Sequence, residues 1–317
     1  MTKRALITGI TGQDGAYLSD FLLKKGYKVY GAVRRTSSIN TARLSYMDVL
    51  DNIELVSMDL GEITNIQRAI EKIEPDEIYN LAAQSFVQTS YEQPIYTSDI
   101  DGIGVTRLLE TIRNLGGKPK FYQASTSEMF GKAKESPQNE NTPFYPRSPY
   151  GIAKLYSHWM TINYRESWDM HACSGILFNH ESPLRPKRFV TQKIISSALR
   201  ISKGADEILE LGRLDISRDW GWAPEYVEAM WLMLQQENPD DYVIATGETN
   251  TLESFVTETF NSLGLDWKKH VRQKEIFMRP TDIEISVGDA SKAHLKLGWK
   301  PKNKMKEVIA LMLQAVN

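Results

Sequence analysis

Apolar residues in the first half of the chain recur with two alternating periods. Short β-branched and apolar runs are separated by longer segments in which apolar residues return every three or four positions. Runs of the first kind predict buried strands, and segments of the second kind predict helices that cover them. The predicted strands are 4–10, 28–33, 53–60, 77–83 and 120–126, and the predicted helices are 15–26, 63–75 and 104–117. This alternation predicts βαβ units, a parallel sheet and a ligand crevice at the carboxyl ends of the strands.

The pattern loosens after about residue 180. The segments there are helix-like at 190–204, 251–264 and 305–316, aromatic-rich at 218–236 and strand-like at 241–247. We therefore predict an α/β fold of two parts. A doubly wound parallel sheet of Rossmann type takes residues 1–178, rejoined by parts of 215–247, and a smaller mixed α/β lobe takes 179–317. Because no Gly/Ser-rich linker separates them, we expect a packed cleft between the two parts.

Composition excludes several classes of protein. The 317 residues carry a formal net charge of only −2 with both signs interspersed, which argues against a nucleic-acid partner. No apolar run approaches the roughly 18 residues of a membrane-spanning helix, and no secretory cleavage pattern begins the chain, so we expect a cytoplasmic protein without membrane contact. A single cysteine, Cys173, excludes an internal disulfide, and the five histidines lack metal-ligand spacing. We expect no bound metal.

The first predicted strand ends in the sequence TGITGQDG at residues 8–15. Gly9, Gly12 and Gly15 form a GxxGxxG pattern at the start of a helix, where glycine permits a sharp turn and close approach of backbone N–H groups to a pyrophosphate. A bare glycine triplet is weak evidence, but its position in the first βαβ unit favours a dinucleotide site over an ordinary turn. The other residues predicted to form this site are Thr11, Gln13 and Asp14.

The segment after the second predicted strand selects the dinucleotide. No Asp or Glu occurs between Phe21 and Tyr46, although NAD sites usually place an acid there for the ribose hydroxyls. Arg34, Arg35 and Ser37 instead supply donors suited to the 2′-phosphate of NADP, so we predict NADP. The alternative is a solvated basic loop. The residues expected to flank the rest of the cofactor, at the ends of the third and fourth strands, are Asp59, Leu60, Leu81, Ala82 and Ala83.

Candidate chemistry follows at YGIAK, where Tyr150 and Lys154 lie four residues apart and share one helix face. We expect the lysine charge, together with that of an oxidised nicotinamide, to lower the tyrosine pKa, so that the phenolate accepts a hydroxyl proton during alcohol oxidation. A surface helix pair is the alternative. The fifth predicted strand ends in ASTSEMFG, which brings hydroxyls and a carboxylate to the same crevice. The candidates there are Thr126, Ser127 and Glu128.

TGITGQDG, NLAAQSF, ASTSEMFG, YGIAK and LFNHESP together resemble the extended short-chain dehydrogenase/reductase superfamily, and within it the GDP-mannose 4,6-dehydratases. The resemblance covers nearly the whole chain. It implies that Thr126 binds the sugar 4-oxygen, that Glu128 is the acid/base, and that Tyr150 is the base for oxidation. Lys154 would position and acidify that tyrosine.

The resemblance also implies a redox-neutral reaction with retained NADP: oxidation at C4, loss of water across C5 and C6, and return of the hydride to C6. The expected product is GDP-4-dehydro-6-deoxy-D-mannose. Three alternatives remain at this point. A GDP-manno-heptose could be the substrate, a reductase or epimerase would not need Glu128, and an NADP-sensing regulatory protein would not need the Tyr/Lys pair.

By the same resemblance, the GDP-sugar substrate is held by side chains of both parts of the chain. They are Ser85, Asn179, Glu181, Lys193, Arg218 and Arg279. The run at 186–188, PKR, departs from the shorter neutral or acidic turn expected for the family, so the resemblance assigns no guanine contacts to it. Family members pair through helices beside the active site, so we expect a homodimer, or a homotetramer if the loop after Arg35 also pairs.

Overall fold

The computed structural model describes residues 2–277 and 281–315, and its centre is a seven-stranded sheet. The strands are β1 (Arg4–Thr8), β2 (Lys28–Val33), β3 (Glu54–Ser57), β4 (Glu77–Asn80), β5 (Lys120–Thr126), β6 (Ala172–Leu177) and β11 (Tyr242–Ile244). All adjacent pairs are parallel, in the order β11-β6-β5-β4-β1-β2-β3. The predicted Rossmann-type α/β fold is therefore confirmed. The order reverses between β1 and β4, where doubly wound sheets open a crevice.

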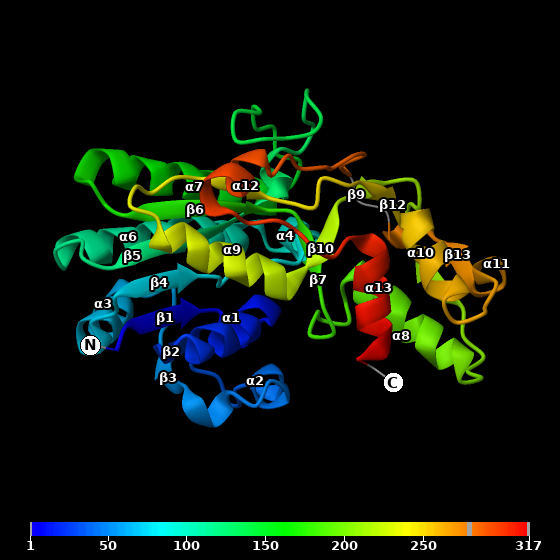
Figure 1. The fold of residues 1–317 in the computed structure, drawn as a ribbon, viewed down its shortest axis with the longest axis horizontal. Helices are drawn as coiled ribbons and strands as arrows, with labels where there is room; N and C mark the ends of the chain where they lie inside the picture. The colour runs from blue at the N-terminus through cyan, green and yellow to red at the C-terminus, as the bar shows by residue number, and fades with distance from the viewer. Residues whose placement is uncertain (1, 278–280, 316–317) are drawn as a thin grey trace.

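Helices cover both faces of this sheet (Figure 1). One apolar core packs under α1 (Gln13–Lys24), α2 (Ala42–Tyr46), α9 (Ala223–Gln235) and α12 (Ser291–Leu297). A second core packs under α3 (Ile63–Ile73), α6 (Gly104–Asn114) and α7 (Pro149–Trp168). Short turns connect these elements: η1 (Leu50–Asn52), α4 (Val87–Glu92), α5 (Pro94–Ser98), the π-helical turn η2 (Asp99–Ile103), and η3 (Ser127–Met129). Helices on both faces leave only the ends of the strands accessible to a ligand.

A second group of elements gathers at one end of the molecule (Figure 1). Its helices are α8 (Val190–Ser202), α10 (Leu252–Asn261), α11 (Trp267–His270) and α13 (Met305–Gln314), with the turn η4 (Glu275–Phe277). Its strands form three two-stranded sheets: β7 (Asn179–Glu181) with β10 (Trp220–Trp222), β9 (Ser217–Arg218) with β12 (Asn250–Thr251), and β8 (Leu209–Leu211) with β13 (Val271–Gln273). Trp220 and Phe255 are buried in the separate core of this group. The proposed division of the chain at residue 178 stays a prediction.

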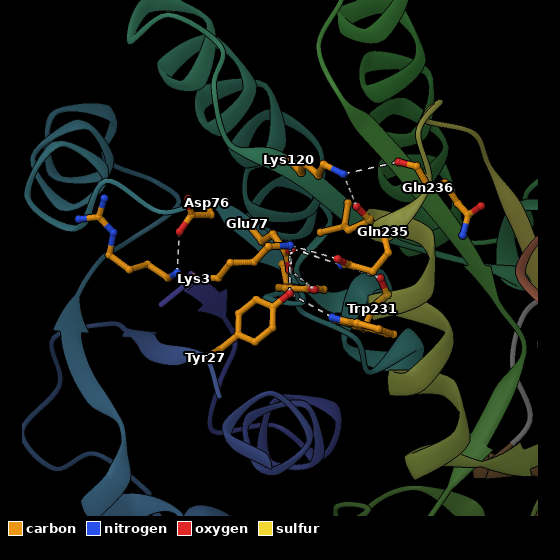
Figure 2. A network of polar contacts seen from close by, with 11 residues as sticks. Lys3, Tyr27, Asp76, Glu77, Lys120, Trp231, Gln235 and Gln236 are labelled. Carbon is orange, nitrogen blue, oxygen red and sulfur yellow. Dashed lines mark hydrogen bonds and ion pairs between the residues drawn. The ribbon is translucent and has the colours of Figure 1, made fainter. Parts of the chain in front are cut away.

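The amino ends of the central strands hold a buried polar network around Glu77, shown in Figure 2. Its carboxylate accepts hydrogen bonds from Lys3 Nζ at 2.9 Å, Tyr27 Oη at 3.0 Å, Gln235 Nε2 at 3.2 Å and Tyr79 Oη at 2.7 Å. Because both oxygens have donors, the buried charge is well compensated. The network joins the residues directly before β1 and β2 to β4 and α9.

Within residues 2–277 and 281–315, no helix has the length and apolar character needed to cross a membrane. The same residues contain no group of three or more His, Cys, Asp or Glu side chains placed to hold a metal ion.

Candidate active site

The glycine turn between β1 and α1 passes very close to neighbouring backbone. Gly9 has a φ of +67°, and a Cβ there would lie 2.8 Å from Ala82 N. A Cβ on Gly15 would lie 2.5 Å from the Cα of Ile10. Gly12, the N-cap of α1, brings no side chain to cap the first N–H groups of the helix. The turn is thus a helix N-terminus without a side-chain cap, which fits the pyrophosphate of a dinucleotide.

The end of β4 is bonded directly to this turn. Thr8 Oγ1 donates to Asn80 Oδ1 at 2.6 Å and accepts from the N–H groups of Leu81 and Ala82, each at 3.0 Å. The predicted cofactor residues Leu81, Ala82 and Ala83 are consequently half-buried beside the glycine loop. The structure brings these two predicted segments together at the switch point of the sheet.

Two predicted cofactor residues use their side chains elsewhere. Asp14 Oδ2 lies 2.9 Å from His180 Nε2, and Gln13 bonds to the His180 carbonyl at 3.1 Å and to Ser182 Oγ at 2.8 Å. His180 lowers the pKa of Asp14 by charge and hydrogen bonding, against the raising effect of burial, and the pKa of His180 is itself raised. These side chains tie the start of α1 to β7 and to Ser182 directly after it.

The basic segment after β2 divides into exposed and fixed arginines. Arg34, Arg35 and Ser37 are exposed, and Arg34 Nη1 donates to Tyr96 Oη at 2.5 Å. Arg43, which the sequence analysis did not single out, donates to the carbonyls of Thr11 at 3.1 Å and Leu184 at 2.7 Å. No local motif marks Arg43, because its partners lie far away in the sequence.

Asp59 and Leu60 follow β3, near the same edge of the sheet. Leu60 is buried, and the Asp59 carboxylate accepts from Gly61 N at 2.9 Å. Asn65 Oδ1 accepts from Asp59 N at 2.7 Å and so fixes this turn to α3. The role of both residues toward the cofactor stays a prediction.

The predicted acid/base group lies in the turn η3, directly after β5. Thr126 and Ser127 are buried, and Glu128 is half-buried. Thr126 Oγ1 caps the turn by accepting from Glu128 N at 3.3 Å. A Cβ on Gly151 would lie 2.8 Å from Glu128 O, so glycine at this point lets α7 begin directly against the turn.

Helix α7 delivers the other two predicted catalytic side chains. Ser148 Oγ accepts from Gly151 N at 3.0 Å as the N-cap, and Pro149 takes the first helical position, where its missing N–H costs nothing. Tyr150 and Lys154 are both buried, and Lys154 Nζ donates to Ala124 O at 2.9 Å. The ammonium lies 5.9 Å from the centre of the tyrosine ring. Both residues therefore face the carboxyl end of β5, as their spacing predicted.

Burial has the largest effect on the pKa values of Tyr150 and Lys154. Burial, followed by the carboxylates of Asp101 and Glu128, raises the pKa of Tyr150, while a side-chain hydrogen bond with Thr126 opposes the rise. Burial also lowers the pKa of Lys154, against the attraction of Asp101. The expected lowering of the Tyr150 pKa included the charge of an oxidised nicotinamide and stays a prediction, whereas in the protein alone desolvation of the phenolate is the largest effect and raises this pKa.

The predicted substrate residues differ in their exposure and in the groups to which they bond. Ser85 is exposed and Asn179 is half-buried in β7, whereas Glu181 is buried and accepts from Thr191 Oγ1 at 2.6 Å. Lys193 Nζ donates to Glu210 O at 2.5 Å, and Arg218 pairs with Asp282 at 3.0 Å. Arg279 lies outside the described residues. Their roles toward a substrate stay predictions.

Comparison with known proteins agrees with the family that the motifs indicated. The family model described as GDP-mannose 4,6 dehydratase matches residues 6–312. The chain is 50% identical to GDP-mannose 4,6 dehydratase 1 of Arabidopsis thaliana, with 98% of this chain and 89% of that protein covered. It is 47% identical to the GDP-mannose 4,6-dehydratase of Vibrio cholerae, with 99% and 93% covered.

A solved structure, the Thermus thermophilus UDP-glucose 4-epimerase in complex with NAD, superimposes with a TM-score of 0.83 at 25% identity over 98% of each chain. That likeness agrees with the parallel sheet and the glycine turn described above. The match of the family model over almost the entire sequence, with two relatives at about half identity, shows that this chain belongs to the GDP-mannose 4,6-dehydratase family.

Proposed function

We propose that this protein removes water from GDP-D-mannose and forms GDP-4-dehydro-6-deoxy-D-mannose, with NADP as a retained cofactor. The observation that carries the proposal is the meeting of Thr126, Glu128, Tyr150 and Lys154 at the carboxyl end of β5. They lie on the same edge of the sheet as the glycine turn. Alcohol oxidation needs the tyrosine and lysine, and elimination of water needs a separate acid/base.

Lys154 and Tyr150 perform the proton transfer of the first step. A nicotinamide held at the glycine turn would supply the hydride-transfer chemistry, from C4 in the oxidation and to C6 in the final reduction. Tyr150 takes the proton of the 4-hydroxyl, and Thr126 orients the 4-oxygen. Because burial raises the pKa of Tyr150, the positive charge at Lys154 and at the cofactor is what makes the phenolate accessible.

Glu128 performs the elimination. The ketone at C4 acidifies the C5 proton, so a half-buried carboxylate at this position can remove it. The same group then protonates the departing 6-hydroxyl, which leaves as water. Tyr150 releases the proton of the 4-hydroxyl to solvent, and Glu128 takes one proton from solvent and delivers it to C5 when the hydride reaches C6, so the net change is the loss of one water.

Residues of the chain fit NADP in two places. The uncapped start of α1 at Gly12 would bind the pyrophosphate. The exposed Arg35 and Ser37 would bind the 2′-phosphate, and Arg34 would join them after leaving Tyr96. Supporting this choice, no acid between residues 21 and 46 competes for an adenosine ribose.

A direct test is incubation of the purified protein with NADP and GDP-mannose, without added reductant, followed by mass spectrometry of the nucleotide sugars. A product lighter by one water is expected. Glu128→Gln should lower the rate by about 10²–10⁴-fold while NADP binding is retained. Arg35→Ala should weaken NADP binding by roughly tenfold and leave NAD binding unchanged.

GDP-manno-heptose run in parallel separates the substrate from the reaction class. Turnover of the heptose alone would refute the choice of sugar. Tight NADP binding without turnover of any sugar nucleotide would refute the enzyme and favour a sensor. Full activity of Glu128→Gln would refute the acid/base assignment.

We also propose that the protein forms a homo-oligomer through α7. Ile152, Tyr156 and Trp159 on this helix are 57%, 44% and 55% exposed and share one face. Tyr164, further along the same helix, is buried and donates to Glu110, so it does not belong to this exposed face. Light scattering of Tyr156→Lys against the unchanged protein tests the interface, and an unchanged mass would contradict it.

A further inference from the structure

The π-helical turn η2 places a buried carboxylate beside the active-site helix. Asp101 is 0% exposed, and its turn packs directly on α7. A Cβ added to the next residue, Gly102, would lie 3.3 Å from Cδ1 of Tyr156 and 3.6 Å from the carbonyl of Ala153. Single π-helical turns weaken the hydrogen-bond ladder of a helix and are frequent at functional sites.

Asp101 is only half satisfied in the described structure. Its Oδ1 accepts from Gln84 N at 2.7 Å, but its Oδ2 is buried and has no hydrogen-bond partner among residues 2–277 and 281–315. An ionised oxygen without a donor in such surroundings is costly. A carboxylate used only to hold the backbone of Gln84 could be an asparagine, which would retain that bond without a charge.

The charged groups around Asp101 identify what its carboxylate acts on. From α7, it interacts electrostatically with Lys154 and Tyr150. The attraction of Lys154 only partly offsets the burial that raises the pKa of Asp101 to about 6. Glu128 approaches Tyr150 from the turn after β5.

The neighbouring acid on η2 has a different environment. Asp99 is neutralised by Arg107 of α6, with 2.8 Å between Asp99 Oδ1 and Arg107 Nη2. Its side chain is also 40% exposed, so solvent screens its charge. The residue that connects Asp101 to β4, Gln84, is uncharged. Asp101 is therefore the acid of η2 whose charge reaches α7 unscreened.

We infer that Asp101 is an electrostatic positioning residue, whose ionised carboxylate balances the buried Lys154 ammonium and sets the pH range in which the Tyr150–Lys154 pair works. This inference rests on the roles proposed above for Tyr150 and Lys154. Asp101 itself transfers no proton to the substrate.

Removal of the charge has a defined consequence. A negative charge stabilises protons on its neighbours, so its loss lowers the pKa of Tyr150 and of Lys154 together. Oxidation needs Tyr150 deprotonated and Lys154 protonated. Both the acid limb and the alkaline limb of the pH profile should consequently move to lower pH.

The test compares Asp101→Asn with the matched control Asp99→Asn. Asparagine at 101 keeps an oxygen for Gln84 N, and the control removes a charge from the same turn at a screened site. We expect both limbs of kcat/KM for GDP-mannose to move down by about one pH unit in Asp101→Asn and to stay in place in Asp99→Asn. At a pH above the alkaline limb, activity should fall about tenfold.

Two outcomes would overturn the inference. A uniform loss of rate in Asp101→Asn, with both limbs unmoved, would leave Asp101 a purely structural role. An equal displacement in Asp99→Asn would show a general charge effect. If Asp101→Asn fails to fold, Asp101→Ser supplies a smaller uncharged side chain for the same comparison.

A second measurement does not depend on turnover. Tyrosinate absorbance is recorded against pH for the original protein and for Asp101→Asn, each with and without Tyr150→Phe. In each case, the absorbance lost on Tyr150→Phe gives the titration of Tyr150 alone. It should occur at lower pH in the variant, and coincident titrations would contradict the inference. Full activity of Tyr150→Phe would refute the proposed function instead, so the two failures remain distinguishable.

Discussion

Two buried carboxylates at opposite ends of the central sheet show how the same chemical group serves different purposes. Glu77, at the amino end of β4, accepts hydrogen bonds from four side chains. Asp101, which contacts the segment after the carboxyl end of β4, has one donor and one unpartnered oxygen among the described residues. Figure 2 shows how closely the donors surround Glu77. A fully bonded carboxylate holds elements together, whereas an incompletely bonded one can act on neighbouring charges.

The comparison predicts that substitutions at the two ends separate activity from stability. At the carboxyl end, Tyr150→Phe should lower the dehydration rate by about 10²–10⁴-fold, because the base for the 4-hydroxyl is lost. Turnover of GDP-mannose by mass spectrometry measures this effect. The matched substitution at the amino end, Tyr27→Phe, should leave turnover unchanged, and a comparable loss of rate there would break the comparison.

The second prediction concerns Glu77 itself. Glu77→Ala removes the acceptor for Tyr27, Tyr79 and Lys3 and leaves buried donors without partners. The free energy of unfolding should fall by about 3–5 kcal/mol. Urea unfolding at a fixed protein concentration measures it. A loss below about 1 kcal/mol would show that water replaces the carboxylate readily.

The third prediction is the pH dependence of stability at Asp101. Burial raises the pKa of this carboxyl to about 6 in the fold, above its ordinary value of 3.8. Its contribution to stability is therefore fully present below about pH 4 and lost as the pH rises through 6. At pH 7.5, Asp101→Asn should be more stable than the original protein by roughly 2–3 kcal/mol, a difference that disappears toward pH 4. Urea unfolding across this range tests the sign, and a less stable variant at pH 7.5 would contradict it.

The smallest effect is expected at Lys3. Its ammonium bonds to Glu77 at 2.9 Å, but its side chain is 48% exposed, so solvent screens the pair. Lys3→Met should cost less than about 1 kcal/mol in the same unfolding experiment, because Tyr27, Tyr79 and Gln235 still donate to the carboxylate. A cost near that of Glu77→Ala would mean that the cation, rather than the neutral donors, stabilises the buried charge.

Much of the fold was predictable because its elements repeat a local period. The five N-terminal strands and the helices α1, α3 and α6 were recognised from apolar spacing, since each buries one face against the sheet. The turn η2 and the three-residue strands β8 and β13 were not recognised. Elements of three to five residues are too short to show an apolar period. The helix α2 was also missed, and it buries only Leu44.

The candidate site was also predictable only where its residues lie close together in the sequence. The glycine turn and the Tyr150–Lys154 pair are each local in sequence, so spacing was sufficient to propose them. Asp101, Arg43 and His180 were missed as functional candidates. Arg43 and His180 bond to partners as far as 141 and 166 residues away, and Asp101 acts on Lys154 from a separate helical turn. Charge and burial at such positions have no signature in a single segment.

Sequence alone thus determined the parallel sheet, the dinucleotide turn and the identity of the candidate reacting side chains, because backbone periodicity and helix spacing are properties of neighbouring residues. Only the tertiary structure decided the electrostatic state of those side chains. Burial raises the pKa of Tyr150 in the protein alone, and Asp101 contributes through a turn that no pattern predicted. The cause is physical: desolvation and Coulomb interactions depend on distances in space, which the order of residues does not contain.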